Sequence, residues 1–198
     1  MKTVILASTS RTRISLLMAA GVPIEAFPPG VDEEAVKQAL RGEGASPEAA
    51  AEALAELKAT RLSRRWPEAL VLGADQMLEC ENRWFDKPAD PEAARRQLLD
   101  LRGRRHRLVS SVVLMQNGVR LWHHTAGATL TMRPFSEAFL ETYLEKAGPA
   151  ILTSVGAYQL EGLGSQLFSS IDGDHFTILG LPLLPLLDIL RHHGVILT

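Results

Sequence analysis

The amino-acid sequence predicts an α/β protein built on a mixed β-sheet. Over the first half of the chain, short apolar runs alternate with capped helical segments, which is typical of strands joined by helices. Further along, Asn117-Gly118 separates two long apolar runs, and this dipeptide is a strong signal for a β-hairpin. Because a hairpin joins antiparallel strands, we expect both strand directions in one sheet.

The first elements follow a strand, turn and helix order. Residues 3–7 form a short β-branched run, and the helical pattern after the polar turn ends at Gly21. Residues 46–48, with the sequence Ser-Pro-Glu, supply an N-cap, a proline at the first helical position and a first-turn acid. The Ala/Leu-rich stretch after them is therefore expected to be helical to about residue 65.

The remaining elements alternate in the same way. Residues 71–78 read as a buried strand with a single charge, and a capped helix over 90–103 follows. The hairpin strands are expected at 108–115 and 119–132. Two further helices are expected, the first over 136–146 and the second from Pro182 to near Gly194, with a Gly-rich segment between them.

Composition is that of an ordinary globular chain. Hydrophobic residues make up 46% and charged residues 22% of the 198 residues, so we expect one domain spanning 1–198. The formal charge of −2 provides no global field for a nucleic-acid polymer or an anionic membrane. Cys80 is the only cysteine and no apolar run reaches signal-peptide or transmembrane length, so we expect a cytoplasmic protein.

A candidate anion site lies at the first strand-to-helix junction. Residues 7–13, Ala-Ser-Thr-Ser-Arg-Thr-Arg, place hydroxyls, free backbone N–H groups and two guanidinium groups at the positive end of a helix. This pattern predicts a phosphate cradle. The alternative is that Ser10 only caps the helix while Arg11 and Arg13 are solvated, and the segment alone leaves both interpretations open.

Three further charged positions are candidates for chemistry. Asp75 is the one charge in an otherwise buried strand, so it needs a metal or a cation as partner, or a place at a cleft. A purely structural ion pair is the alternative. Lys58 lies on or beside the buried face of its helix, and Lys87 precedes a proline in an extended turn. Either ammonium could reach a polyphosphate, and either could equally be a surface lysine.

A carboxylate cluster, Asp32-Glu33-Glu34, follows the Pro-Pro-Gly turn at residues 28–30. Hard cations such as magnesium choose oxygen ligands, so this cluster suits a metal. Acidic residues are also favoured in the first turn of a helix. The two interpretations are equally weighted on the sequence.

Together these motifs resemble the Maf family of nucleotide pyrophosphatases, and the match runs nearly end to end. Ser10 and Arg13 stand in the two fixed places of the family's opening Ser-x-x-Arg motif. The later motifs follow in the family's order: Asp32-Glu33, Lys58-Ala59, Gly73-Ala74-Asp75, Lys87-Pro88, Gly156-Ala157-Tyr158 with Glu161-Gly162, and Gly173-Asp174 with Gly180-Leu181-Pro182.

The resemblance implies an elongated, Maf/ITPase-like fold with a nucleotide-binding cleft between two lobes. It also implies hydrolysis of a nucleoside triphosphate to the monophosphate and pyrophosphate. Asp75 would be the proton acceptor, and Glu33 a catalytic or metal-binding carboxylate. A divalent cation (Mg, Mn or Co) would be held by Glu33 and Asp75, and a homodimer is left open. The triphosphate would be bound by Ser8, Ser10, Arg13, Lys58 and Lys87.

Three positions bear on the choice of base. Pyrimidine-selective members usually carry Arg, Thr and Gln where this chain has Thr12, Gln76 and Glu161. Gln76 and Glu161 are similar to the branch that acts on 7-methyl-GTP, whereas Thr12 departs from both branches. The family's Lys before Ala-Gly-Ala-Tyr is replaced here by Ser154-Val155.

We therefore expect a modified or non-standard substrate such as 7-methyl-GTP, because a carboxylate at Glu161 can accept both donors on the guanine edge. An ion pair of Glu161 with Arg11 or Arg13 is the alternative role for that residue. For the whole protein, one alternative is a dTTP/UTP pyrophosphatase. Another is a non-catalytic, nucleotide-binding regulator of septum formation.

Overall fold

The computed structural model describes residues 3–197 and contains one seven-stranded sheet. Its order is β2-β1-β3-β5-β6-β7, and β4 pairs with β3 outside this path. β1 is parallel to β2 and β3, whereas all other strand pairs are antiparallel. The mixed α/β sheet expected from the sequence is confirmed.

The strands are β1 (Val4–Ala7), β2 (Ile24–Ala26), β3 (Leu70–Cys80), β4 (Arg83–Phe85), β5 (Arg105–Gln116), β6 (Val119–Met132) and β7 (Phe168–Asp172). The α-helices are α1 (Arg11–Ala19), α2 (Glu33–Gly42), α3 (Pro47–Ser63), α4 (Pro91–Leu101), α5 (Glu137–Ala147), α6 (His175–Ile178) and α7 (Leu183–His192). Three 3₁₀ turns, η1 (Gly148–Thr153), η2 (Val155–Ala157) and η3 (Leu163–Leu167), connect α5 to β7.

The expected helix starts are confirmed by their caps. The side chains of Ser10, Ser46, Asp90 and Ser136 each accept a hydrogen bond from a backbone N–H three residues further on. These bonds satisfy donors that a first helical turn leaves free. The strands β2 and β4 were not predicted, because three residues are too few to show a hydrophobic period.

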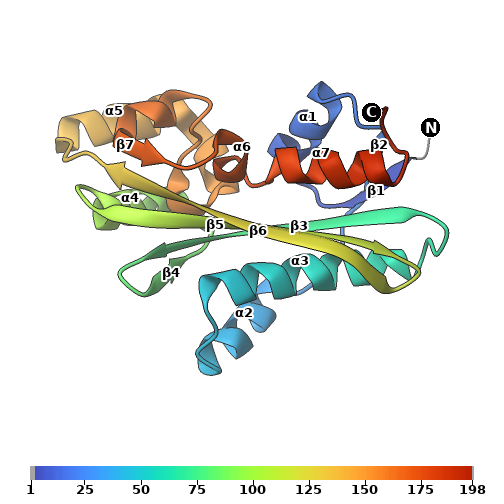
Figure 1. Ribbon diagram of the computed structural model, residues 1–198. Helices are drawn as coiled ribbons and strands as arrows, with labels where there is room; N and C mark the ends of the chain where they lie inside the picture. Colours follow the sequence, from blue (N-terminus) through green and yellow to red (C-terminus); the bar gives the residue numbers. More distant parts are fainter. Residues whose placement is uncertain (1–2, 198) are drawn as a thin grey trace.

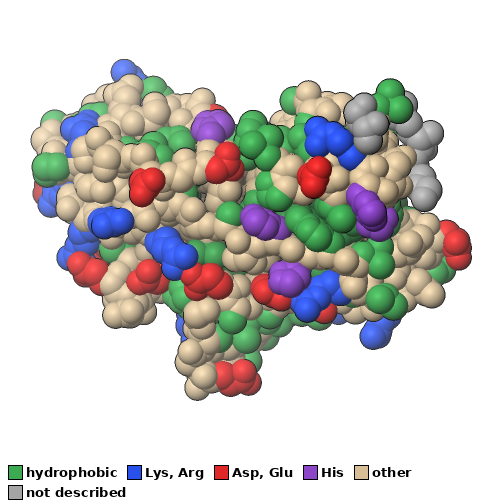
Figure 2. Space-filling model, viewed as in Figure 1, with side chains coloured by type: hydrophobic (Ala, Val, Ile, Leu, Met, Phe, Trp, Pro, Cys, Tyr) green, Lys and Arg blue, Asp and Glu red, His purple; other side chains and the backbone are tan. Residues whose placement is uncertain are grey.

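The helices cover the two faces of the long sheet unequally (Figure 1). α3 and α2 lie along one face, whereas the other face carries two separate groups (Figure 1). At one end, α1 and α7 enclose an apolar cluster around Leu6, Leu72 and Leu186. At the other end, α4, α5 and the 3₁₀ turns enclose a cluster around Leu98 and Leu130. The two clusters are the cores of two lobes on one sheet, and the outline of the molecule dips between these lobes (Figure 2).

One edge of β3 is open between these lobes. β1 pairs with β3 only as far as Gly73, and β4 begins to pair at Leu78. Because β5 occupies the opposite edge, residues 74–77 have no strand beside them on the β1 side. Neighbouring side chains on a strand point to opposite faces, so Asp75 meets α3 whereas Gln76 meets α6. This open stretch of β3, residues 74–77, is called the notch, and it gives access to both faces of the sheet.

The helices are short by the standard of membrane spans. α3, with 17 residues, is the longest of the described helices. No helix among residues 3–197 combines the length and the apolar character needed to cross a bilayer.

Candidate active site

The centre of the candidate site is a buried ammonium between two carboxylates. Nζ of Lys58 lies 2.6 Å from Oδ1 of Asp75 and 2.8 Å from Oε1 of Glu33. Lys58 and Asp75 are each 4% exposed, so a cation, one of the partners expected for Asp75, accompanies the charge on the strand. The second oxygen, Oδ2 of Asp75, is buried and has no hydrogen-bond partner among the described residues. A buried acceptor without a partner is costly and points to a ligand, a water molecule or catalysis.

Close packing of α3 on β3 makes this contact. A Cβ at Gly73 would overlap the carbonyl oxygen of Ala55 and would lie 2.9 Å from Cβ of Ala59. Only glycine allows the helix to approach this closely. Gly73 and Asp75 share one face of β3 because they are two residues apart, so the close approach brings Lys58 onto the carboxylate.

The helix-start interpretation of the 32–34 carboxylate cluster is confirmed, and the metal interpretation stays a prediction. Asp32 is the N-cap of α2 and accepts from the backbone N–H of Ala35 at 3.1 Å, which makes the cluster a helix start. Glu33, at the first position of α2, nevertheless reaches Lys58. Burial alone would raise the pKa of Glu33, but the charge and hydrogen bond of Lys58 lower it below 4.5.

Arg13 is buried, so the alternative that both arginines of the junction are solvated is wrong for Arg13. Arg11 is exposed. Nε of Arg13 donates to the carbonyl of Gly180 at 2.8 Å. Nη1 of Arg13 donates to the carbonyl of Ala74 at 2.9 Å and to Oγ of Ser8 at 3.4 Å. Nη2 makes no hydrogen bond to another described residue. A guanidinium carries five N–H donors, so Arg13 keeps two for a ligand.

The hydroxyls at the junction support Arg13 and the helix. Oγ of Ser8 accepts from the backbone N–H of Ser10 at 3.2 Å, and Oγ of Ser10 accepts from the backbone N–H of Arg13 at 3.4 Å. The capping role of Ser10 is thus confirmed, and contact of either serine with a phosphate stays a prediction.

Lys87 follows β4 on the same edge of β3. The residue is exposed, yet partial removal from water and the positive charges of Arg13 and Lys58 lower its pKa from 10.5. The carboxylates of Glu33 and Asp75 act on it in the opposite direction. The charges of Arg13, Lys58, Glu33 and Asp75 thus all act on the pKa of Lys87.

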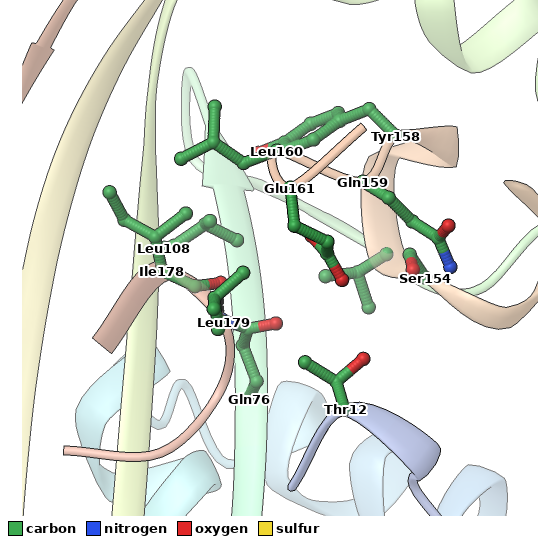
Figure 3. A pocket seen from close by; sticks show the side chains of 11 residues that line it. Thr12, Gln76, Leu108, Ser154, Tyr158, Gln159, Leu160, Glu161, Ile178 and Leu179 are labelled. Atoms are coloured by element: carbon green, nitrogen blue, oxygen red, sulfur yellow. Dashed lines mark hydrogen bonds between the residues drawn. The ribbon is translucent and has the colours of Figure 1, made fainter. Parts of the chain in front are cut away.

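A polar pocket lies on the other face of the sheet (Figure 3). Nε2 of Gln76 donates to Oγ of Ser110 at 3.1 Å and to the carbonyls of Thr177 and Ile178 at 3.2 and 2.9 Å. Ser110 in turn donates to the carbonyl of Thr177 at 2.8 Å. The amide nitrogen faces only acceptors, so Oε1 is the atom that Gln76 turns into the pocket (Figure 3).

Glu161 and Thr12 line the same pocket from opposite sides (Figure 3). Glu161 is exposed and forms no ion pair within the described part of the chain, so its expected alternative pairing with Arg11 or Arg13 is wrong. Ser154 also lines the pocket. The pocket thus combines the carbonyl oxygen of Gln76 with a free carboxylate.

The Gly156-Ala157-Tyr158 motif builds the pocket wall. The hydroxyl of Tyr158 lies 2.9 Å from Nε2 of His106, and both residues are buried. Gly156 has φ +75°, and a Cβ there would lie 2.7 Å from the ring of Tyr158. The motif is therefore required for the close packing of this wall.

The sequence analysis gave no role to four residues that support the site. Ser110 holds Gln76, and Gly180 holds Arg13 through its carbonyl. Lys37 and Asp86 form an ion pair at 2.6 Å beside Lys87. Two of them had a signal in the sequence: Gly180 stands in a motif of the family resemblance, and Lys37 lies four residues after Glu33 and hence on the same face of a helix.

Fold and site together define an α/β protein with a buried charged cluster at Asp75 and a pocket at the neighbouring Gln76. The chain belongs to the Maf family, because the profile described as "Maf-like protein" matches residues 3–193. The resemblance drawn from the motifs is thereby confirmed.

Individual relatives extend over nearly the whole chain. The chain is 60% identical to a protein named nucleoside triphosphate pyrophosphatase from Paramagnetospirillum magneticum, covering 96% of this chain and 97% of that protein. It is 52% identical to a protein named 7-methyl-GTP pyrophosphatase from Mesorhizobium japonicum, covering 98% and 97%. Among solved structures, a HAM1 protein from Coxiella burnetii aligns with a TM-score of 0.45 and 15% identity, covering 67% and 73%.

Proposed function

We infer that the protein is a nucleoside triphosphate pyrophosphatase, which hydrolyses its substrate to the nucleoside monophosphate and pyrophosphate. The observation that carries this function is the Glu33–Lys58–Asp75 cluster beside Arg13 at the open edge of β3. The name of the relative from Paramagnetospirillum magneticum, at 60% identity, supports the same activity.

Hydrolysis between the α- and β-phosphates needs a water aimed at phosphorus, a base for its proton and cations for the spreading charge. Oδ2 of Asp75 is the buried acceptor without a partner, so we assign Asp75 as the base. Lys58 holds Oδ1 of Asp75 at 2.6 Å and thereby fixes which oxygen faces the water. The free Nη2 of Arg13 and the ammonium of Lys87 bind the phosphates, with Ser8 and Ser10 at the helix start.

A divalent cation (Mg, Mn or Co) fits the donors at this site. Two carboxylates, Asp75 and Glu33, converge on Lys58, and one carboxylate oxygen has no partner. Magnesium is commonly held by one or two carboxylates together with substrate phosphates rather than by a complete protein cage. When bound, the cation would supply Lewis-acid stabilisation of the phosphate charge. The described residues contain no cluster of three or more His, Cys, Asp or Glu side chains suited to a metal, so the substrate phosphates would have to supply the remaining ligands.

The pocket favours a guanosine triphosphate, in particular one methylated at N7. Guanine presents two adjacent donors, N1–H and the exocyclic amine, and the pocket presents two acceptors, Oε1 of Gln76 and the carboxylate of Glu161. Uracil and thymine place carbonyl oxygens on both sides of their single N–H, so they would meet repulsion and lose hydrogen bonds. N7 methylation adds positive charge, which the carboxylate of Glu161 favours.

Pyrophosphate release from 7-methyl-GTP, GTP, dTTP and UTP, measured for wild type and Glu161→Gln, tests this function. We expect the highest kcat/KM on 7-methyl-GTP and a selective loss on guanosine substrates in the variant. Higher efficiency on dTTP or UTP, without loss of guanosine turnover in Glu161→Gln, would support a pyrimidine pyrophosphatase instead. Absence of turnover with every triphosphate, while nucleotide still binds, would support the non-catalytic regulator.

We further propose that the chain works as a single domain in the cytoplasm. One continuous sheet that carries both apolar clusters supports the single domain. The lone, buried Cys80 supports a reducing compartment.

A further inference from the structure

Asp86, which directly precedes Lys87, joins three separate elements. Its carboxylate accepts from Nζ of Lys37 at 2.6 Å and from Nη2 of Arg41 at 2.8 Å, both on α2. Its backbone carbonyl accepts from Nε2 of Gln97 on α4 at 2.9 Å. The turn that carries Lys87 is therefore tied to α2 on one side and to α4 on the other.

The residues on α2 form a single charged stripe. Glu33, Lys37 and Arg41 are each four residues apart and therefore share one face of the helix. The first of them binds Lys58, and the other two bind Asp86. Lys37 is only 8% exposed, whereas Val36 and Leu40 of α2, which pack against the cluster around Leu54, are only partly buried.

We propose that Asp86 is a positioning residue, which sets the place of Glu33 and of Lys87 around Asp75 by holding α2 against the β4–α4 turn. Because Lys37 is the one buried residue of α2, its ion pair with Asp86 helps to decide where the first residue of the helix lies. Loss of the Asp86 charge would also leave the ammonium of Lys37 buried and unpaired, close enough to act on Glu33 and Asp75. This role rests on the proposed pyrophosphatase function.

Kinetics of Asp86→Asn, Asp86→Glu and Lys37→Met, measured on the 198-residue protein, test the proposal. We expect Asp86→Asn to lower kcat about tenfold while KM changes less than about threefold, because catalytic geometry is lost but the base pocket is untouched. Asp86→Glu keeps the charge and should recover most of kcat. The double variant Lys37→Met/Asp86→Asn should lose little more than either single variant, since the two residues act as one unit.

Asp100→Asn is the matched control. Asp100 forms a comparably short pair with Arg83, at 2.8 Å between α4 and β4, and among the described residues no ion pair joins it to α2. We expect wild-type kcat for this control. A loss in Asp100→Asn as large as in Asp86→Asn would overturn the proposal, and so would a kcat within about twofold of wild type in both Asp86→Asn and Lys37→Met.

Fluorescence gives a readout that does not depend on turnover. Arg41 lies over the ring of Trp84 at 5.2 Å, so release of α2 exposes this ring. In a Trp66→Phe/Trp122→Phe background, Asp86→Asn should make Trp84 more accessible to acrylamide, and Asp100→Asn should not. Unchanged quenching of Trp84 in Asp86→Asn would overturn the positioning role of Asp86, even if the wild-type protein cleaves triphosphates. Increased quenching in a protein that cleaves no triphosphate would instead count against the proposed function.

Discussion

The Nζ atom of Lys58 on α3 lies 2.6 Å from Oδ1 of Asp75 on β3, and both side chains are almost completely buried. This pair leaves Oδ2 of Asp75 without a partner. A buried carboxylate with one oxygen held and the other free is suited to take a proton from a water molecule. Several consequences of this geometry can be measured.

Asp75→Asn should abolish turnover while leaving the fold intact. The amide keeps the shape of the carboxylate but cannot accept the proton, and Glu33 still neutralises Lys58. Loss of a general base costs on the order of 10²- to 10⁴-fold in rate. Pyrophosphate release measures the rate, and near-ultraviolet circular dichroism checks the fold. Activity close to wild type in the purified variant would remove Asp75 from the mechanism.

Lys87→Ala should lower kcat/KM without changing stability. Lys87 is exposed, and contact with developing charge would make its loss cost on the order of 2–4 kcal/mol in transition-state stabilisation. Lys146→Ala, on α5, is the control for loss of a surface lysine.

Arg13→Ala should lower kcat/KM by a similar amount and also lower Tm, because Arg13 holds the carbonyls of Gly180 and Ala74. If kcat/KM falls less than about tenfold in both Lys87→Ala and Arg13→Ala, neither side chain stabilises charge in the transition state.

Gly73→Ala should weaken both stability and activity. The added Cβ would overlap the carbonyl oxygen of Ala55, so α3 must move away from β3 and Lys58 must move away from Asp75. Overpacking of this kind costs about 1–3 kcal/mol. Gly42→Ala is the control, since a Cβ there meets nothing within 4 Å. Urea unfolding and pyrophosphate release are the measurements, and equal behaviour of the two variants would contradict the close-packing argument.

Ser110→Ala should reduce base selectivity more than overall rate. Ser110 accepts from Nε2 of Gln76 and donates to the carbonyl of Thr177, so its loss loosens the amide whose oxygen faces the pocket. The ratio of kcat/KM for 7-methyl-GTP to that for dTTP is the measurement. Ser111→Ala is the control, because Ser111 bonds to Thr125 on the other face of the sheet. An unchanged ratio in Ser110→Ala would mean that Gln76 keeps its orientation by other means.

Stability should fall as the pH drops from 6.5 toward 4 because of His106. Burial lowers the pKa of His106 from 6.5 to about 4. Between these values the unfolded chain binds a proton that the folded protein does not, so the free energy of unfolding decreases as pH falls, by up to the order of 3 kcal/mol. His106→Gln can still bond to Tyr158 but does not titrate. Unfolding curves at several pH values should therefore be flatter for this variant, and identical slopes would exclude His106 as the source.

Much of the fold follows from local sequence rules, and the exceptions have physical causes. The caps at Ser10, Ser46 and Asp90 place three helices because one side-chain oxygen satisfies a free N–H. The Asn117-Gly118 turn joins β5 to β6, and both residues have positive φ. β4 and α6 were not predicted from the sequence, because they contain only three and four residues, which are too few to show a hydrophobic period.

The sequence by itself determined the α/β class, the family and the residues that carry charge in otherwise apolar surroundings, because hydrophobic period and caps are local properties. Only the tertiary structure decided which of these charges meet. Glu33, Lys58 and Asp75 come from three elements and converge because Gly73 admits α3 to β3. Likewise, the roles of Ser110, Gly180 and Asp86 depend on partners far away in the chain. Contacts of this kind depend on how elements pack, which no local pattern encodes.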